Sequence, residues 1–267
     1  MAIYKQGCTD REMVKRIQKV VGCTPDGVWG PKTTVAVKAW QRAHKLTDDG
    51  VVGPATLAAM GLADNTQTVN DGISITNAFI KIHITASKKR EIKYIAIHFT
   101  AGSTSKGGTA LRTRNVFLQR EASADFVVDD DTIVQVNPDI RNYYCWAVGD
   151  NKNPYTGGGS LNGKATNKNT VSIEICSTLR QGTSASVPNH NGWSFTDKAL
   201  GNARRLVRYL MKEYGIPKEN VIRHYDATGK LCPGIPGWND GPLYDTSGRG
   251  TGRRSDSREW KRFWDSL

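Results

Sequence analysis

The residues with the most distinctive chemistry in this sequence are two histidines and one cysteine. His224 and Cys232 lie in one short stretch, residues 223–234, and His98 lies at the end of a strand-like segment far upstream. Two imidazoles and one thiolate suit a zinc ion, and three protein ligands leave the fourth tetrahedral position for water. These residue types favour a catalytic metal site over a closed structural one. The open alternative is a strand-end histidine, a surface histidine and a buried free thiol, because short motifs also match by chance.

Two segments of alternating polarity position further candidates. Residues 94–100 place isoleucines and a phenylalanine on one face and His98 on the other, so the His98 side chain is expected to point to a cleft or to solvent. Residues 171–176 alternate in the same way and put Glu174 on their polar face. Burying a glutamate in a central strand is costly unless it is paired, so this face is either a site or solvated.

Hydrophobic periodicity predicts the helices and further strands that surround these two strands. The predicted helices cover residues 10–21, 109–120, 196–214 and 258–267, and further predicted strands cover residues 124–128, 132–136 and 221–222. The helix over residues 196–214 has the clearest end signals, because Thr196 suits its N-cap and Gly215 and Pro217 terminate it.

An eight-residue repeat organises the N-terminal part. Residues 26–33 read D-G-V-W-G-P-K-T, and residues 49–56 read D-G-V-V-G-P-A-T. The glycines mark tight turns, and each proline can occupy the first turn of a helix, where no amide donor is needed. Between the copies lies an apolar stripe formed by Val35, Val37, Ala39 and Trp40. Three short helices around a small core are expected.

The polar, aperiodic residues 63–74 predict a linker between a small domain, residues 1–62, and a larger one, residues 75–267. Within the larger domain, residues 150–169 predict a long loop, and long loops in compact domains are often functional. A basic C-terminal extension carries Arg249, Arg253 and Arg254. These arginines fit either a nucleic-acid contact or a solvated loop.

Composition narrows the class of protein. The 267 residues have room for one medium and one small domain. The net charge of +12 is compatible with nucleic acid, anionic lipid or an anionic cell-wall polymer as partner, or with solubility alone. No apolar run reaches the length of a signal peptide or a membrane span, so we expect synthesis in the cytoplasm without membrane insertion. Five cysteines leave at least one unpaired, and Cys8 and Cys23 either pair or remain thiols.

Two family resemblances rest on these motifs. The N-terminal repeat resembles, over residues 8–62, the peptidoglycan-binding domain of many cell-wall hydrolases. Residues 75–235 resemble the zinc-dependent N-acetylmuramoyl-L-alanine amidase family, through residues 97–102, 123–128, 173–175 and 224–234. The resemblance implies an α/β fold with a central mixed β-sheet flanked by helices, plus a small N-terminal three-helix domain. It also implies zinc held by His98, His224 and Cys232.

The amidase resemblance leads to hypotheses for single side chains. Glu174 is expected to act as general base, Lys230 to stabilise the tetrahedral oxyanion, and Asp226 to orient the histidine two residues before it. Two positions depart from common family patterns. Ala147 replaces a histidine, and Ala124 stands where some phage members have a tyrosine. Because these two side chains are missing, the expected mechanism depends more on Glu174 and Lys230.

The whole chain resembles a phage endolysin or a similar autolysin. This implies peptidoglycan as partner, through its glycan strand and stem peptide, action as a monomer, and holin-type release to the cell wall. The main alternative is a peptidoglycan-recognition protein without hydrolysis, but such proteins usually lack a cysteine ligand, so Cys232 favours an enzyme. Charge alone also allows a nucleic-acid binder. No segment resembles a base-reading motif, so no nucleic acid is expected.

Overall fold

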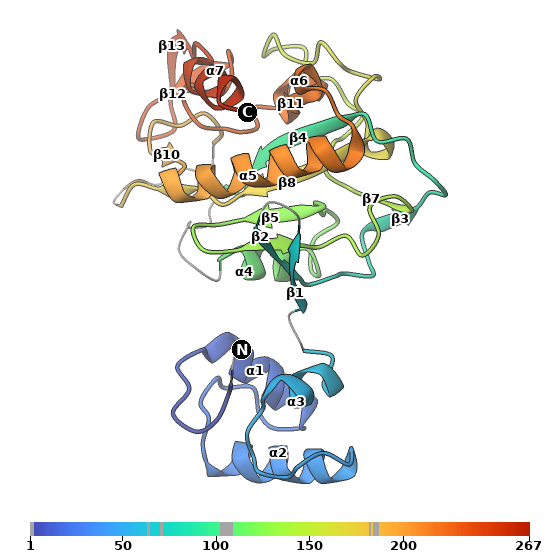
Figure 1. Ribbon diagram of the computed structural model, residues 1–267. Coiled ribbons are helices and arrows are strands. Elements are labelled where there is room, and N and C mark those ends of the chain that lie inside the picture. Colours follow the sequence, from blue (N-terminus) through green and yellow to red (C-terminus); the bar gives the residue numbers. More distant parts are fainter. Residues whose placement is uncertain (1–2, 63–64, 70–71, 102–108, 182, 184–186) are drawn as a thin grey trace. The chain divides into compact units, whose positions relative to one another are not determined.

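The computed structural model describes residues 3–62, 65–69, 72–101, 109–181, 183 and 187–267. The chain divides into two compact units, Met1–Asn65 and Thr66–Leu267, and each has its own hydrophobic core (Figure 1). Across the described residues, no helix combines the length and the apolar character that a membrane span needs.

Helices α1 (Arg11–Val20), α2 (Pro31–Ala43) and α3 (Pro54–Ala59) form the N-terminal unit, which confirms the predicted three-helix fold. They enclose a core that contains Val14, Ile17, Trp29, Val52 and Leu57. The prediction was wrong for Val35, which is 68% exposed although Val37 is buried. Residues two positions apart in a helix are separated by about 200° around its axis, so the two valines face opposite sides of α2.

A buried glutamine holds each copy of the repeat together. The side-chain amides of Gln18 and Gln41 donate to the aspartate, the first valine carbonyl and the threonine hydroxyl of the turn that follows, at 2.8–3.3 Å. Their Oε1 atoms accept from the turn glycine at 2.9 Å in both copies. This glycine has a φ of 75° each time, which other residues rarely adopt. The repeat thus encodes one hydrogen-bonded turn twice, each docked on the preceding helix.

A seven-stranded mixed sheet forms the centre of the second unit, in the order β1-β2-β6-β5-β8-β4-β11. Strands β11, β4, β8 and β5 are parallel neighbours, whereas β6 pairs antiparallel with β5 and parallel with β2. The strands are β1 (Asn65–Val69), β2 (Ile73–Asn77), β4 (Tyr94–Phe99), β5 (Phe126–Val128), β6 (Ile133–Gln135), β8 (Thr170–Ile175) and β11 (Val221–Arg223). The mixed sheet confirms the predicted fold class.

Short elements complete this unit. Two-stranded ladders join β3 to β7, β9 to β10 and β12 to β13. Their bounds are β3 (Ile84–Ala86), β7 (Tyr143–Cys145), β9 (Thr178–Leu179), β10 (Trp193–Ser194), β12 (Pro242–Tyr244) and β13 (Gly250–Arg254). The 3₁₀ turns are η1 (Asn167–Asn169) and η2 (Lys218–Asn220).

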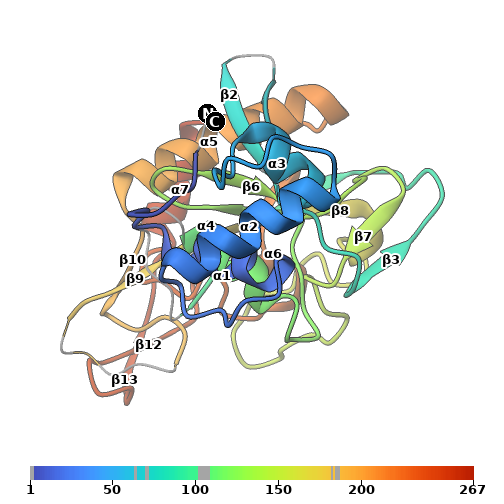
Figure 2. The same cartoon turned by 90° about the horizontal axis from the view of Figure 1, so that it is seen from below.

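Helices cover both faces of the central sheet (Figures 1 and 2). Helix α5 (Asp197–Tyr214) packs its apolar stripe on one face, and α4 (Thr109–Val116) packs on the other. The predicted caps of α5 are confirmed. The Thr196 side chain accepts from the amide of Ala199, and Gly215 ends the helix with a φ of 64°.

Strand alternation decides which side chains reach the site. Ile95, Ile97 and Ile173 belong to the core under α5. Successive side chains of a strand point to opposite faces, so His98 and Glu174 lie on the face away from α5. The two residues are paired in register across the parallel strands β4 and β8, which makes their side chains neighbours. This confirms that His98 points away from the hydrophobic face.

The structure corrects the predicted linker over residues 63–74. Residues 65–69 and 73–74 belong to β1 and β2 of the sheet, whereas residues 63, 64, 70 and 71 lie outside the described residues. Ile73 is 1% exposed, so this segment contributes to the core. The polar sequence hid the strands because ladder hydrogen bonds use backbone groups that every non-proline residue carries.

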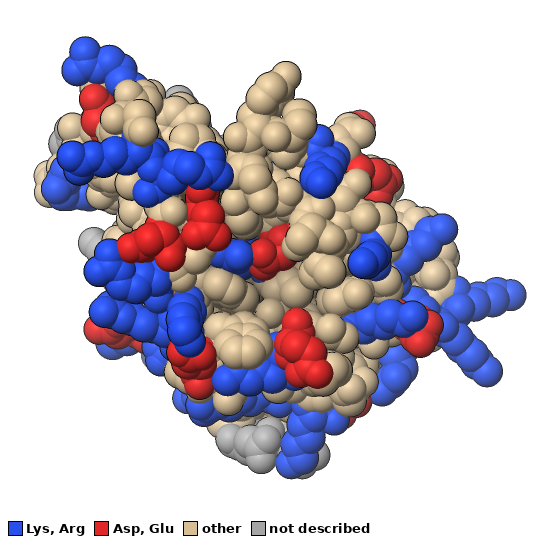
Figure 3. Space-filling view, turned by 90° about the horizontal axis from the view of Figure 1, so that it is seen from above, with Lys and Arg blue, Asp and Glu red and all other residues tan. Residues whose placement is uncertain are grey.

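The C-terminal extension consists of the β12–β13 hairpin and helix α7 (Arg258–Asp265). Helix α7 packs Phe263 against Trp238, with ring centroids 5.3 Å apart. Acidic residues pair with several of its basic ones, as in Arg249–Asp245, Arg258–Asp256, Lys261–Asp265 and Arg262–Glu259. Figure 3 shows basic side chains spread widely over one face with acidic ones among them. The extension is therefore not a uniform basic patch.

A buried ion pair anchors the segment before β4. Arg90 and Asp125 lie 3.7 Å apart with side chains only 1% exposed. The Arg90 guanidinium also donates to the carbonyls of Tyr143 and Thr170, and Asp125 accepts from the Ser172 amide at 2.8 Å. Replacing Arg90 by methionine leaves a buried carboxylate without its cation. We expect the free energy of unfolding to fall by about 3–5 kcal/mol, measured by urea denaturation.

The matched control for this prediction is Lys261→Met, which removes an exposed i,i+4 pair with Asp265 in the same unit. Its effect should stay within about 0.5 kcal/mol, because solvent screens exposed pairs. Equal urea midpoints for Arg90→Met and Lys261→Met would show that the buried pair contributes no more than a surface one.

Candidate active site around a His-His-Cys cluster

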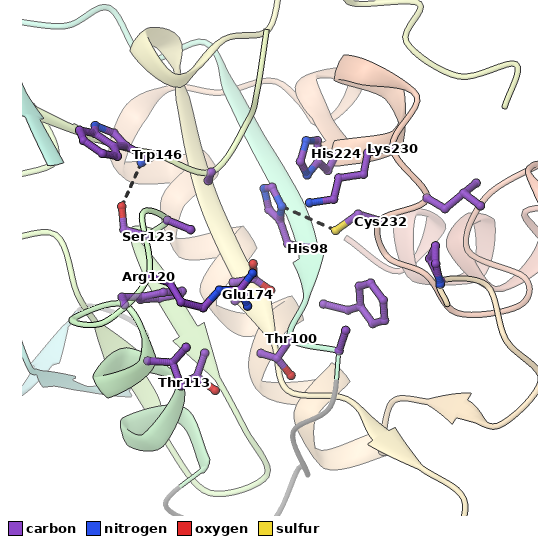
Figure 4. Close-up of a pocket in the computed structure, with 18 of the residues that line it drawn as sticks. His98, Thr100, Thr113, Arg120, Ser123, Trp146, Glu174, His224, Lys230 and Cys232 are labelled. Carbon is purple, nitrogen blue, oxygen red and sulfur yellow. Dashed lines mark hydrogen bonds between the residues drawn. The ribbon is translucent and has the colours of Figure 1, made fainter. Parts of the chain in front are cut away.

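The three predicted metal ligands come together at one end of β4. His98 lies near the carboxyl end of β4, His224 begins helix α6 (His224–Thr228), and Cys232 follows that helix. Their candidate ligand atoms all lie within 4.8 Å of one another. The two imidazole centroids are 4.6 Å apart, and Cys232 Sγ lies 3.7 Å from His98 Nδ1. Figure 4 shows the three side chains gathered around a common point, and all three are buried.

A short helix and a tight return position His224 and Cys232. Residues 224–228 form one helical turn directly after β11. Gly229 ends this turn with a φ of 79°, and the Tyr225 amide donates to the Cys232 carbonyl at 2.9 Å. The chain therefore reverses within eight residues, which brings the thiol back beside the imidazole.

The chemistry of the cluster fits a zinc ion. Among the described residues, His98 Nε2 and His224 Nδ1 are buried without a hydrogen-bond partner, which is unusual unless another ligand satisfies them. Burial lowers the pKa of His98 well below its usual value, and that of His224 to about 3, so both rings are neutral and able to bind a metal. Burial raises the pKa of Cys232 to about 12, so a metal must displace the thiol proton.

Two charged side chains border the cluster. Glu174 lies beside His98 on the neighbouring strand, and its Oε2 is buried without a partner among the described residues. Burial raises the pKa of Glu174 to about 8, although the nearby charges of Lys230 and Arg120 oppose this shift. Lys230 is exposed, and its charge also lowers the pKa of both histidines. Glu174 and Lys230 are thus both close to the histidines.

The cluster opens into a cavity of about 550 Å³. Glu174, His98 and Cys232 line it together with Arg120 and Trp146 (Figure 4). A second cavity of about 530 Å³ adjoins it and shares His224 and Lys230 with it, besides Ala122, Trp146 and Ala147. The two cavities therefore leave room for an extended ligand that passes His224 and Lys230.

The models of two known protein families match this sequence. The sequence model of the N-acetylmuramoyl-L-alanine amidase family matches residues 88–235, which is more than half of the chain and includes all three candidate ligands. The chain belongs to this amidase family. A second model, that of a peptidoglycan binding domain, matches residues 14–60 in the N-terminal unit.

Bacillus proteins are among the similar sequences. The chain is 34% identical over 143 residues to the N-acetylmuramoyl-L-alanine amidase CwlH of Bacillus subtilis, covering 52% of this chain and 46% of CwlH. It is 27% identical over 171 residues to the amidase CwlL of Bacillus licheniformis, covering 60% of this chain and 42% of CwlL. The chain thus spans less than half the length of these curated relatives. A solved catalytic domain, that of XlyA, is 28% identical with a TM-score of 0.43, covering 60% of this chain and 90% of that domain.

The structure corrects one predicted role in the amidase domain. Asp226 does not orient His224, because both of its carboxylate oxygens bind Arg223, at 2.6 Å and 2.9 Å, and one also accepts from the Arg223 amide. Arg223 in turn donates to the Trp238 carbonyl and to the Ser257 hydroxyl. Asp226 therefore fixes the start of α6 to the C-terminal extension.

The structure also shows where Ala147 and Ala124, the two residues that depart from family patterns, are located. Ala147 lines both cavities, as His224 does, so a histidine at this position would border the site. Ala124 is buried in an apolar cluster with Ala110 and Val127. Sequence reasoning missed Arg120, which lines the cavity near Glu174. No sequence signal distinguished Arg120, because it follows the end of α4 among other polar residues.

Proposed function

We propose that this chain hydrolyses the amide bond between the lactyl group of N-acetylmuramic acid and the L-alanine of the stem peptide, with zinc held by His98, His224 and Cys232. The observation that carries this proposal is the approach of three ligand atoms to within 4.8 Å, next to a carboxylate on the adjoining strand. Family membership supports the same reaction. A zinc ion in this site would polarise the amide carbonyl and lower the pKa of a bound water toward about 7.

In this proposal Glu174 moves the proton. Its buried Oε2 lies on the cavity face of β8, where it can accept a proton from the attacking water and pass it to the leaving amine. The raised pKa of Glu174 suits a group that must both accept and release a proton near neutral pH. The product is a free amino terminus on L-alanine.

In this proposal Lys230 stabilises the negative charge that develops on the carbonyl oxygen. It lines both cavities next to His224. We expect Lys230→Met to lower kcat by about 10²-fold, the lower range for loss of an oxyanion donor because this side chain is exposed. Zinc content should stay at the wild-type level. Lys164→Met, at an exposed lysine that lines neither cavity, serves as control, and equal rates for the two variants would contradict the role.

The N-terminal unit is proposed to anchor the chain to peptidoglycan, in line with the family model that it matches. A second binding unit on the same chain raises the effective concentration of the amidase domain at the wall. Because the N-terminal unit is proposed to bind peptidoglycan, the expected substrate is this polymer rather than a small soluble amide.

Digestion of purified cell walls tests the proposal. Mass analysis should identify stem peptides with free L-alanine amino termini, and intact muramic acid on the glycan product. A chelator should abolish their release, and added zinc should restore it. A recognition protein without hydrolysis would bind the same walls and release nothing, and a glycosidase would instead produce new reducing sugars.

A further inference from the structure

A single helical turn carries His224 and leads the chain on to Cys232. Helix α6 spans only five residues, and a helix of that length is not stable in water by itself. It keeps its place through contacts with the rest of the unit. The side chains that hold α6 therefore also decide where the His224 imidazole lies and where the chain turns toward Cys232.

Arg223 and Asp226 clamp the start of this helix. The Nε and one terminal nitrogen of the Arg223 guanidinium donate to the two Asp226 oxygens, at 2.9 Å and 2.6 Å, and the Arg223 amide donates to one of them at 2.8 Å. The Arg223 side chain is only 9% exposed. A bidentate arginine–carboxylate pair has a defined geometry. The pair thus ties the last residue of β11 to the third residue of α6.

The other terminal nitrogen of Arg223 reaches the C-terminal extension, which lies beside β11 and α6 in Figure 1. It donates to the Trp238 carbonyl at 3.0 Å and to the Ser257 hydroxyl at 2.7 Å. The Trp260 ring lies against the same guanidinium, with its centroid 5.3 Å from Cζ. All three partners lie beyond residue 235, where the match to the amidase family model ends. One side chain therefore connects the metal-binding turn to a segment that the family model does not cover.

The extension is itself fixed to the core of the second unit. Trp238 and Phe263 are each 3% exposed and belong to the apolar cluster under α5. The Trp238 ring also contacts the Trp260 ring, with centroids 5.9 Å apart. Buried aromatic rings make large apolar contacts, so this part of the extension is a firm support. Through Arg223, the position of α6 is therefore tied to the core.

The extension also holds two further segments near the site. Arg254 donates to the Thr156 carbonyl in the long loop over residues 150–169. The Asn189 side chain donates to the Gly241 carbonyl at 3.2 Å, and Asn189 directly follows Pro188, which lines the first cavity. The extension thus contacts the surroundings of the cluster on several sides.

We propose that Arg223 is a positioning residue of the metal site. It holds α6, and with it His224, against the C-terminal extension, so that the extension sets how firmly a metal ion is retained. This inference rests on the proposed zinc site. Ligands that are held in place before binding lose less freedom when the ion binds, and groups that orient metal ligands from outside contribute to affinity for this reason.

The rate of zinc release to an excess of chelator tests this role in the zinc-loaded full chain. Arg223→Met should release zinc about 10-fold faster than wild type, since losing an outer partner of a metal ligand costs about 10–100-fold in affinity. Arg90→Met is the matched control, because it breaks another buried arginine pair of the same unit. Arg90 precedes β4, whereas His98 lies near the far end of that strand, so this variant should keep the wild-type rate. An unchanged rate for Arg223→Met, or equal acceleration by both variants, overturns the proposal.

Cobalt in place of zinc gives a readout that general destabilisation does not move. The absorption bands of a bound cobalt ion depend on the type and geometry of its ligands. The bands of Arg223→Met should be shifted from those of wild type, and the bands of Arg90→Met should coincide with them. Coincident bands for Arg223→Met contradict a positioning role.

Ser257→Ala tests the extension separately, because it keeps the Arg223–Asp226 pair and removes one bond beyond it. Zinc release should accelerate about 3-fold, as expected for one hydrogen bond. Ser247→Ala is the control, since that hydroxyl bonds only within its own turn, to Asp245 at 2.6 Å, and its rate should stay at wild type. A wild-type rate for Ser257→Ala removes the extension from the proposal. If wild type itself binds neither zinc nor cobalt, the proposed metal site fails and the positioning role fails with it.

Discussion

Replacing Glu174 by glutamine is expected to lower kcat by about 10²–10⁴-fold, the usual contribution of a general acid–base group. Glutamine has nearly the same shape but cannot accept the proton of the attacking water. Glu174 belongs to β8 and is paired in register with His98, so the substitution leaves the strand and the ligand cluster in place. The measurement is the initial rate of release of L-alanine amino termini, with zinc per chain determined on the same sample.

The control for this variant is Glu213→Gln, which removes an exposed carboxylate paired with Arg141 at 3.7 Å. Its rate should equal that of wild type. If Glu174→Gln keeps one zinc and the wild-type rate, the base is another group. If zinc is lost together with activity, the variant has disturbed the cluster and the role of Glu174 must be judged from Glu174→Asp instead.

Removing the thiolate ligand is the second large change. Cys232→Ser should weaken zinc binding by more than about 100-fold, because losing even an outer partner of a metal ligand costs about 10–100-fold in affinity. Hydrolysis should fall below detection after dialysis. The two remaining ligands, His98 and His224, are buried imidazoles without a charge to offset that of the ion. Metal analysis after dialysis and the zinc-dependent shift in melting temperature measure the effect.

Cys23→Ser provides the matched control for thiol chemistry. Cys8 and Cys23 are both free thiols in the N-terminal unit, so neither is committed to a disulfide in this structure. Cys23→Ser should keep one zinc per chain and the wild-type rate. Retention of one zinc and full turnover by Cys232→Ser would remove the cysteine from the ligand set and leave the two histidines without their third partner.

Much of the fold is encoded in local sequence. Alternation in β4 and β8 predicts which residues point away from the hydrophobic face, and the apolar stripe of α5 with Thr196 and Gly215 predicts that helix almost to its ends. These signals succeed because they depend on neighbours within a few positions of the chain. The same local signals do not predict β2, since its place in the sheet depends on pairing with β6, which is distant in sequence, and β1 joins the sheet only through β2.

The sequence by itself determined the ligand types, two histidines and a cysteine, and the faces on which His98 and Glu174 lie. Only the tertiary structure decided that these residues share one site, that Asp226 binds Arg223 rather than His224, and that Arg120 and Glu174 line the same cavity. The physical reason is that side-chain direction follows from the local period of a strand or helix. Strand register and the choice of partner follow from burial of distant segments against one another, which no short window of sequence contains.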